Sequence, residues 1–215
     1  MKKIIKFLLV IVMVLITFTC TSCGEKAKSE DWDKFFKKLN NANNLTVEAS
    51  IEATGIKYSQ INRWDKVNKM RFTSGIARIS PTYYVTNVDG KCVAWMKDIE
   101  NDKEVWASFD YSLDFEEIFS DIDVGRLCDV DYACLNKFDK NDFSFNKNKF
   151  YLKQELCEKF GISEMTVDFA MLKNECVIKI VEDAGTFRES TIKITISKLN
   201  KTKIDLPDEI KKGTK

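Results

Sequence analysis

The chain has 215 residues, and none of them is histidine. This absence excludes Ser-His-Asp and Cys-His catalysis, most catalytic zinc sites and the usual pH switch. Carboxylate or lysine chemistry stays open. Acidic pairs such as Glu116-Glu117 are nevertheless typical of a solvated face, and nothing ties them to a nucleophile or a metal. We therefore expect a protein that is not an enzyme and that needs no metal and no cofactor.

Proline and glycine are also scarce, with 2 and 8 residues, so the chain has no linker rich in either. Neither sign of charge is in excess. Without the first 22 residues, which include three lysines, 31 basic residues face 33 acidic ones. This balance implies no basic face, and nucleic acid is not an expected partner. Hydrophobic residues make up 44% of the chain, which is enough to bury a core.

The chain begins with a short apolar segment. Basic residues precede this segment, and small residues follow it. Met1-Lys2-Lys3 precedes it, and its uncharged part, Phe7 to Phe18, has 12 residues. A membrane span needs about 20 apolar residues. These features predict an export signal rather than a spanning helix. An uncleaved membrane anchor is the alternative.

The residues before Cys23 resemble a bacterial lipobox. Thr21-Ser22 is the expected small pair, whereas Cys20 stands where such motifs usually have leucine. In lipobox signals the cysteine is acylated with palmitate-type chains and the peptide is cut before it. We expect residues 1–22 to be a signal peptide and Cys23 to be the lipidated residue. The protein would then be a lipoprotein, anchored at the extracytoplasmic face of a bacterial membrane.

The cysteines beyond this signal are not spaced as in metal-binding motifs. The five remaining cysteines are Cys92, Cys128, Cys134, Cys157 and Cys176. Disulfides are permitted outside the membrane, but an odd number leaves at least one thiol over, and the pairing stays open. For most of these cysteines we expect the role of a small buried hydrophobic residue.

One amphipathic helix is expected after the signal. Ser29 is its predicted N-cap, acidic residues fill its first turn, and an apolar stripe follows at helical spacing. The stripe consists of Trp32, Phe35 or Phe36, Leu39 and Ala42, and it predicts packing on the core. The asparagine-rich residues 40–44 end this helix.

A long series of strands is expected next. Leu45 to Thr54 alternates between apolar and polar residues, as a half-buried antiparallel strand does. Asp89-Gly90 predicts a type I′ hairpin that pairs Tyr84 with Trp95. Both faces of this hairpin are largely apolar, so either a second layer covers it or the sheet curls around something. The other expected strands are 60–73, 76–79, 104–109, 142–145, 149–152, 165–171, 176–180, 191–197 and 203–207, and further helices are expected at 112–122 and 153–160.

This order of elements resembles the LolA-like and LppX-like envelope lipoproteins. The similarity lies in Phe36 to Val47, in Phe150-Tyr151-Leu152-Lys153 and in the ending Ile204-Asp205-Leu206-Pro207. The resemblance implies an α+β fold. Its strongly curved antiparallel sheet would form an open half β-barrel, and an N-terminal amphipathic helix and a few short helices would cover the concave side. Residues 29–210 would be this single domain, between a lipidated tether at 23–28 and a polar tail at 211–215.

The resemblance also implies a function in the cell envelope. Members of that family hold acyl chains in an apolar cavity, so we expect lipid binding or carriage of another apolar ligand. The candidate lining residues are Trp64, Phe72, Tyr84, Trp95 and Trp106, each of which could equally be an ordinary core aromatic residue. The alternative is a surface lipoprotein that has a filled core and docks an unspecified protein partner.

Overall fold

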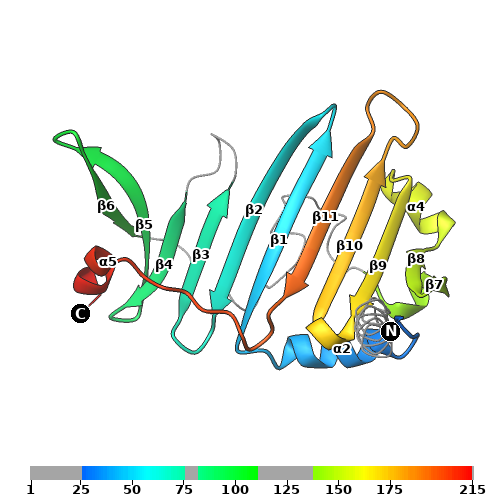
Figure 1. Ribbon diagram of the computed structural model, residues 1–215, viewed down its shortest axis with the longest axis horizontal. Helices are drawn as coiled ribbons and strands as arrows, with labels where there is room; N and C mark the ends of the chain where they lie inside the picture. Colours follow the sequence, from blue (N-terminus) through cyan, green and yellow to red (C-terminus); the bar gives the residue numbers. More distant parts are fainter. Residues whose placement is uncertain (1–25, 76–81, 111–137, 215) are drawn as a thin grey trace, which may run out of the picture.

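The computed structural model describes residues 26–75, 82–110 and 138–214 (Figure 1). These residues form one antiparallel sheet of 11 strands that does not close into a barrel, together with few helices. The strands are β1 Asn44–Ala53, β2 Ile56–Asp65, β3 Met70–Gly75, β4 Tyr83–Val88, β5 Lys91–Glu100, β6 Lys103–Asp110, β7 Phe143–Asn146, β8 Lys149–Leu152, β9 Glu164–Ala170, β10 Glu175–Glu182 and β11 Ser190–Ser197. The α-helices are α2 Asp31–Asn40, α4 Gln154–Phe160 and α5 Asp208–Gly213, and the 3₁₀ turns are η4 Lys140–Asp142 and η5 Met171–Lys173.

The strand order is β6-β5-β4-β3-β2-β1-β11-β10-β9-β8-β7. The chain therefore starts in the middle of the sheet, meanders outward from β1 to β6, and later returns from the other edge through β7 to β11. Every neighbouring pair is antiparallel. The two edge strands of the described sheet are β6 and β7.

Two-residue turns join several of these strands. At Thr54-Gly55, Asp89-Gly90, Asn101-Asp102 and Lys147-Asn148 both residues have positive φ. This geometry defines a type I′ turn, whose twist matches that of the flanking strands. The predicted turn at Asp89-Gly90 is confirmed, and so is the pairing of Tyr84 with Trp95.

The sheet has two faces that different parts of the chain cover. We call one the helix face; it includes Val47 of β1, and α2 packs against it over β7–β9. The other is the strap face; it includes Thr46, and the C-terminal strap, residues 198–214, crosses it. Thr46 and Thr202 meet there, with their Oγ1 atoms 2.8 Å apart. In Figure 1 the strap runs along the lower edge of the sheet to α5, beside β4 and β5.

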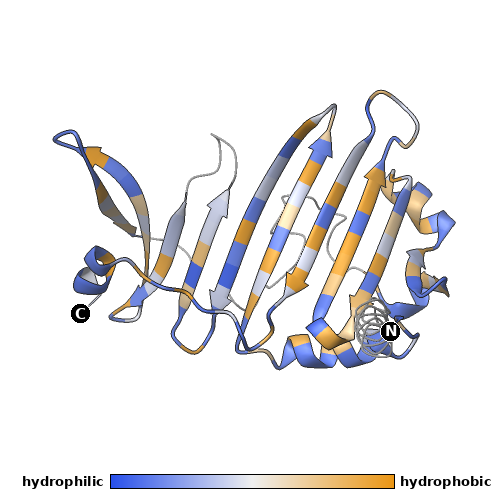
Figure 2. Cartoon of the chain, in the orientation of Figure 1, coloured by the Kyte–Doolittle hydropathy of each residue, from blue (hydrophilic) through white to orange (hydrophobic). Residues whose placement is uncertain are grey.

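The apolar core lies on the helix face, where α2 covers the strands on the β7 side. Trp32 of α2 contacts three phenylalanine rings, with centroid distances of 4.9 Å to Phe143, 5.1 Å to Phe150 and 5.9 Å to Phe169. The alternate residues of β10 and β11 complete this core as buried aliphatic side chains: Ile178, Ile180, Ile192, Ile194 and Ile196. Figure 2 shows the resulting alternation of apolar and polar bands along the strands.

The start of α2 differs from the prediction. The helix begins at Asp31, its N-cap is Glu30, and no side chain caps it. The carboxylate of Asp31 instead accepts the N–H of Lys28 at 2.6 Å, which closes the preceding turn. The predicted cap at Ser29 is therefore wrong, whereas the predicted apolar stripe is buried at Trp32, Phe35 and Leu39.

Two predicted strands are also corrected. Residues 60–73 do not form one strand, because β2 ends at Asp65 and β3 begins at Met70. The Asp65 carboxylate accepts hydrogen bonds from the backbone and the side chain of Asn68, which stabilises the intervening turn. Residues 203–207 form no strand; they lie in the strap, on the way to α5.

The strap is fixed at both of its ends. The N–H of Thr202 donates to Asn44 Oδ1 at 2.7 Å, and the N–H of Asn200 donates to the Asn44 carbonyl at 2.8 Å. Ile210 of α5 is fully buried. Helix α5 thus extends to Gly213, whereas we expected the domain to end at residue 210 and a polar tail to follow.

Several predictions fall outside the described residues. They are the signal peptide and Cys23, the strand at 76–79, the helix at 112–122, and Cys128 and Cys134. The remaining predicted strands and the helix at 153–160 are confirmed within a few residues, including the left-handed Gly161 that ends α4.

Candidate functional site

Strand register brings four of the five predicted lining residues onto the strap face. Phe72 lies directly opposite Tyr84, and Tyr84 lies opposite Trp95. Trp106 faces Lys97 on the next strand, two residues beyond Trp95. Directly paired residues of antiparallel strands share a face, so these side chains all stand on the same side of the sheet. We call Phe72, Tyr84, Trp95 and Trp106 the aromatic row.

The rings of this row contact one another across β3, β4 and β6. The centroids of Phe72 and Tyr84 are 5.0 Å apart, and those of Tyr84 and Trp106 are 5.3 Å apart in an edge-to-face arrangement. The Arg63 guanidinium lies 5.3 Å above the Phe72 ring. Phe72, Tyr84 and Trp106 are each half-buried. They therefore form a continuous aromatic surface with a cation at one end, and solvent still reaches it.

Trp95 has a different environment from the rest of the row. Its indole Nε1 donates to Thr86 Oγ1 at 2.8 Å, and only 8% of the residue is exposed. Gly213 of α5 lies against the same ring; a Cβ at this glycine would come within 2.5 Å of the Trp95 Cη2 atom. Trp95 is therefore the residue on which the strap rests rather than an open contact surface.

The structure does not bring Trp64 together with the other four residues. Trp64 pairs with Leu45 and Arg71, which places it on the helix face, where it is 2% exposed. The Arg71 guanidinium lies 5.4 Å from the Trp64 ring and 5.8 Å from the Tyr83 ring. Trp64 is thus a buried residue that stacks with a cation.

Polar groups accompany Trp64 inside this part of the sheet. Asn62 and Thr73 are both fully buried, and Thr73 Oγ1 donates to Asn62 Oδ1 at 2.9 Å. Within the described ranges, the Nδ2 of Asn62 and the Nε of Arg71 are buried without a hydrogen-bond partner, as is the Nε of Arg63 on the strap face. Buried donors without acceptors are uncommon, and carboxylate or phosphate oxygens would satisfy them. Sequence reasoning missed these residues, because β2 and β3 contain many other polar residues and no pattern singles out Asn62, Arg63 and Arg71.

Electrostatic effects at the aromatic row are modest. Burial raises the pKa of the Tyr84 hydroxyl, the Arg63 charge opposes this rise, and Asp205 of the strap adds to it. The hydroxyl therefore stays protonated at neutral pH and can act as a hydrogen-bond donor.

The described cysteines are part of the core. Cys92, Cys157 and Cys176 are all buried. Burial raises the pKa of the Cys157 thiol and raises that of Cys176 far more. Thiols with raised pKa values are poor nucleophiles and poor metal ligands.

Two kinds of site are absent from the part of the chain that the structure describes. No three potential ligands among His, Cys, Asp and Glu gather there to hold a metal ion. No helix in the same ranges has the length and apolar character needed to cross a membrane.

Comparison with known proteins adds no family to these observations. No family model matches the chain, and no curated protein matches it. The resemblance to LolA-like lipoproteins stays a prediction.

Proposed function

We propose that this protein is a membrane-anchored lipoprotein that binds or transports a lipid, or another apolar ligand, in the bacterial cell envelope and catalyses no reaction. In this proposal the sheet is a strongly curved half-barrel like that of the LolA-like family, and helices cover its concave side. The aromatic row is the part of the described surface that contacts the ligand.

The single observation that supports ligand binding is the half-buried state of Phe72, Tyr84 and Trp106. An ordinary core would enclose such rings, and each fully buried aromatic side chain would contribute about 2–3 kcal/mol. Here the Tyr84 ring contacts both Phe72 and Trp106, and all three side chains stay partly open to solvent. An apolar ligand would cover the same surface, and Arg63 at its end suits an anionic head group.

Tryptophan fluorescence during titration with fatty acids and phospholipids tests this proposal. We expect a saturable change for one lipid class. The variant Tyr84→Ala should weaken the affinity about 5- to 30-fold, which is about 1–2 kcal/mol for a lost aromatic contact. Tyr58→Ala is the matched control, because Tyr58 is 42% exposed and lies on the helix face.

Two outcomes would count against ligand binding at the aromatic row. One is the lack of a saturable change for every lipid class. The other is an equal affinity of Tyr84→Ala and the parent chain.

The anchor is tested separately through processing of the signal. Either Cys23→Ala or the signal-peptidase inhibitor globomycin should block maturation, because lipobox signals are cut only next to an acylated cysteine. Normal processing in both experiments would contradict the anchor and leave ligand binding untouched.

A second candidate function is a protein interaction module with a filled core. The filled helix face under α2 favours it, because Phe35, Phe150 and Phe169 are buried there, with the Phe169 ring in contact with the other two. This alternative predicts docking near the tip of the β5–β6 hairpin, where Ile99 is 73% exposed on the strap face. An envelope pull-down that depends on Ile99, without lipid binding, would support it.

A further inference from the structure

The two ends of the sheet differ in charge. The end of the sheet at which β1, β3, β5, β8 and β10 begin is called the lower end (Figure 1). The end at which these strands finish is called the upper end. At the lower end, the connections 66–69, 89–90, 147–148, 171–174 and 198–201 contain six lysines and a single acidic residue, Asp89. The lysines are Lys66, Lys69, Lys147, Lys173, Lys198 and Lys201.

The upper end shows the opposite balance. Its connections, where the structure describes them completely, are 54–55, 101–102, 153–163 and 183–189, and they contain three basic and five acidic residues. Since the chain as a whole is nearly neutral, a general abundance of lysine does not explain this difference. The connections at the lower end are therefore locally basic, although the balanced charge of the whole chain did not imply a basic face.

Helix α2 brings three lysines to the lower end, although Glu30, Asp31 and Asp33 at its start offset their charge. Its lysines Lys34, Lys37 and Lys38 are exposed on the side away from Trp32 and Phe35. These three lysines line a hollow of about 440 Å³ together with Asn41, Met171 and Asn200. Three separate elements, α2, η5 and the start of the strap, thus border one open depression that three lysines line.

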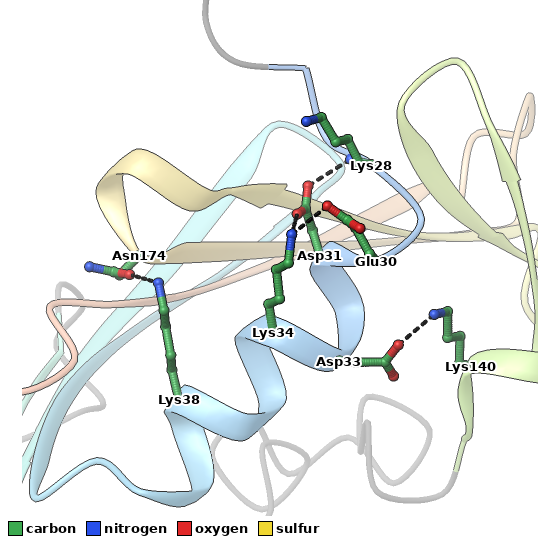
Figure 3. Close-up of polar contacts among 8 residues, drawn as sticks. All are labelled: Lys28, Glu30, Asp31, Asp33, Lys34, Lys38, Lys140 and Asn174. Carbon is green, nitrogen blue, oxygen red and sulfur yellow. Dashed lines mark hydrogen bonds and ion pairs between the residues drawn. The ribbon is translucent and has the colours of Figure 1, made fainter.

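Some of these lysines have partners, and others do not. Figure 3 shows Lys34 with Glu30 and Asp31, while Lys38 Nζ donates to Asn174 Oδ1 at 2.7 Å. Within the described ranges, by contrast, no acidic side chain forms an ion pair with any of four exposed lysines: Lys37, Lys173, Lys198 and Lys201. The positive potential of the lower end is therefore only partly neutralised.

The lower end is also close in sequence to the proposed anchor. Helix α2 begins at Asp31, eight residues after Cys23. Eight extended residues span at most about 28 Å. A chain anchored at Cys23 would therefore keep α2 near the membrane surface, where each lysine interacts with anionic lipid.

We propose that the lower end is a docking surface for an anionic lipid membrane, with lipid phosphate groups at the unpaired lysines and one of them in the hollow beside α2. This inference extends the proposed membrane attachment, but it depends on neither the acyl chains nor the aromatic row. Charge alone distinguishes the two ends. Exposed apolar tips occur at both, with Leu172 below and Phe187 above.

Vesicle co-sedimentation of the polypeptide from Gly24 onward tests the proposal, since this chain includes every described helix and strand and lacks the acylated cysteine. It should bind vesicles that contain phosphatidylglycerol and not vesicles of phosphatidylcholine alone, and salt should weaken the binding. The triple variant Lys37→Glu, Lys173→Glu, Lys201→Glu should lower partitioning at least a hundredfold, because each lysine lost near an anionic surface lowers it about fivefold.

A charge-matched control is available at the upper end. Lys153→Glu, Lys159→Glu, Arg188→Glu changes the net charge equally at three exposed positions. This variant should bind anionic vesicles within a few-fold of the parent chain. All six positions are exposed, so both variants should fold, which circular dichroism would verify.

Three results would overturn the docking surface. One is binding that does not depend on phosphatidylglycerol, and another is an equal loss in both triple variants, which would reflect net charge alone. The third is tighter binding of the chain to nucleic acid than to anionic vesicles at the same salt concentration, which would assign the lower end to that polymer instead. Fluorescence titration of the lower-end triple variant with fatty acids and phospholipids tests the aromatic row separately. A variant that no longer binds vesicles but still binds these lipids would leave ligand binding at the aromatic row intact.

Discussion

The strands on the two sides of β1 differ in what they bury. On the β11–β7 side, the helix face is lined by aliphatic and aromatic residues, and α2 closes it with Trp32 and Phe35. On the β2–β6 side, the same face includes Asn62 and Arg71, and the strap face includes the half-buried rings of Phe72, Tyr84 and Trp106. The first half has the composition of a hydrophobic core. The second half includes polar groups whose burial costs free energy, which is typical of binding surfaces.

The largest expected effect is on the rate of thiol labelling at Cys176, which lies in the core half. Burial raises the pKa of Cys176 well above that of an ordinary thiol, so the reactive thiolate is scarce at any given pH below the raised pKa. In the native protein we expect Cys176 to react orders of magnitude more slowly than in denaturant, measured by mass spectrometry after labelling at pH 8. Rapid native labelling at Cys176 would show that this half opens easily.

Two phenylalanine truncations compare the halves directly. Phe169 is 1% exposed and contacts Trp32, Phe35 and Phe150, so Phe169→Ala should lower the free energy of unfolding by about 3–5 kcal/mol. Phe72 is only half-buried, and Phe72→Ala should cost about 1–2 kcal/mol. Urea denaturation gives both values. Equal losses would remove the distinction between a core half and a binding half.

The contact between the strap and Trp95 can be tested by a substitution at Gly213, which covers Trp95 on the β2–β6 side. In Gly213→Ala the new methyl group would overlap the Trp95 ring, so α5 should shift away at a cost of about 1 kcal/mol. Acrylamide should then quench Trp95 more strongly, whereas Lys212→Ala, at an exposed neighbour, should leave quenching unchanged. Unaltered quenching in Gly213→Ala would mean that the strap does not rest on Trp95.

The smallest effect is expected at the surface of the core half. Lys140 Nζ lies 2.6 Å from Asp33 Oδ2, but the Asp33 side chain is 69% exposed (Figure 3). Exposed ion pairs contribute little, so Asp33→Asn should change the free energy of unfolding by less than about 0.5 kcal/mol. A loss above about 1 kcal/mol would show that this pair, and not the buried rings, fixes η4 to α2.

Much of the fold was predictable because local patterns specify it. The alternation in β1, the hairpin at Asp89-Gly90 and the glycine after α4 each follow from short-range chemistry. The turn between β2 and β3 was missed because it contains no glycine or proline, and Asp65 and Asn68 form it instead. Ile204 and Leu206 alternate as in a strand, but β11 already lies between β1 and β10, so residues 203–207 have no adjacent free edge.

The candidate site was predictable only in part. The hairpin turn fixes the faces of Tyr84 and Trp95, and these two residues do share a face. The face of Trp64 depends on where β2 ends and on its register with β1, and a slip of one residue moves a side chain to the other face. The strap contact at Trp95 and the charge difference between the two ends depend on tertiary structure, which no local pattern reveals.

Native mass spectrometry tests the central claim, that the aromatic row binds an apolar ligand, most directly. The polypeptide from Gly24 onward would be purified from a bacterial envelope fraction without detergent. We predict a discrete excess mass that matches an extractable lipid in the parent chain and that is lost in Tyr84→Ala. A bare polypeptide mass, unchanged after incubation with membrane lipid, would contradict the account and favour the protein interaction module.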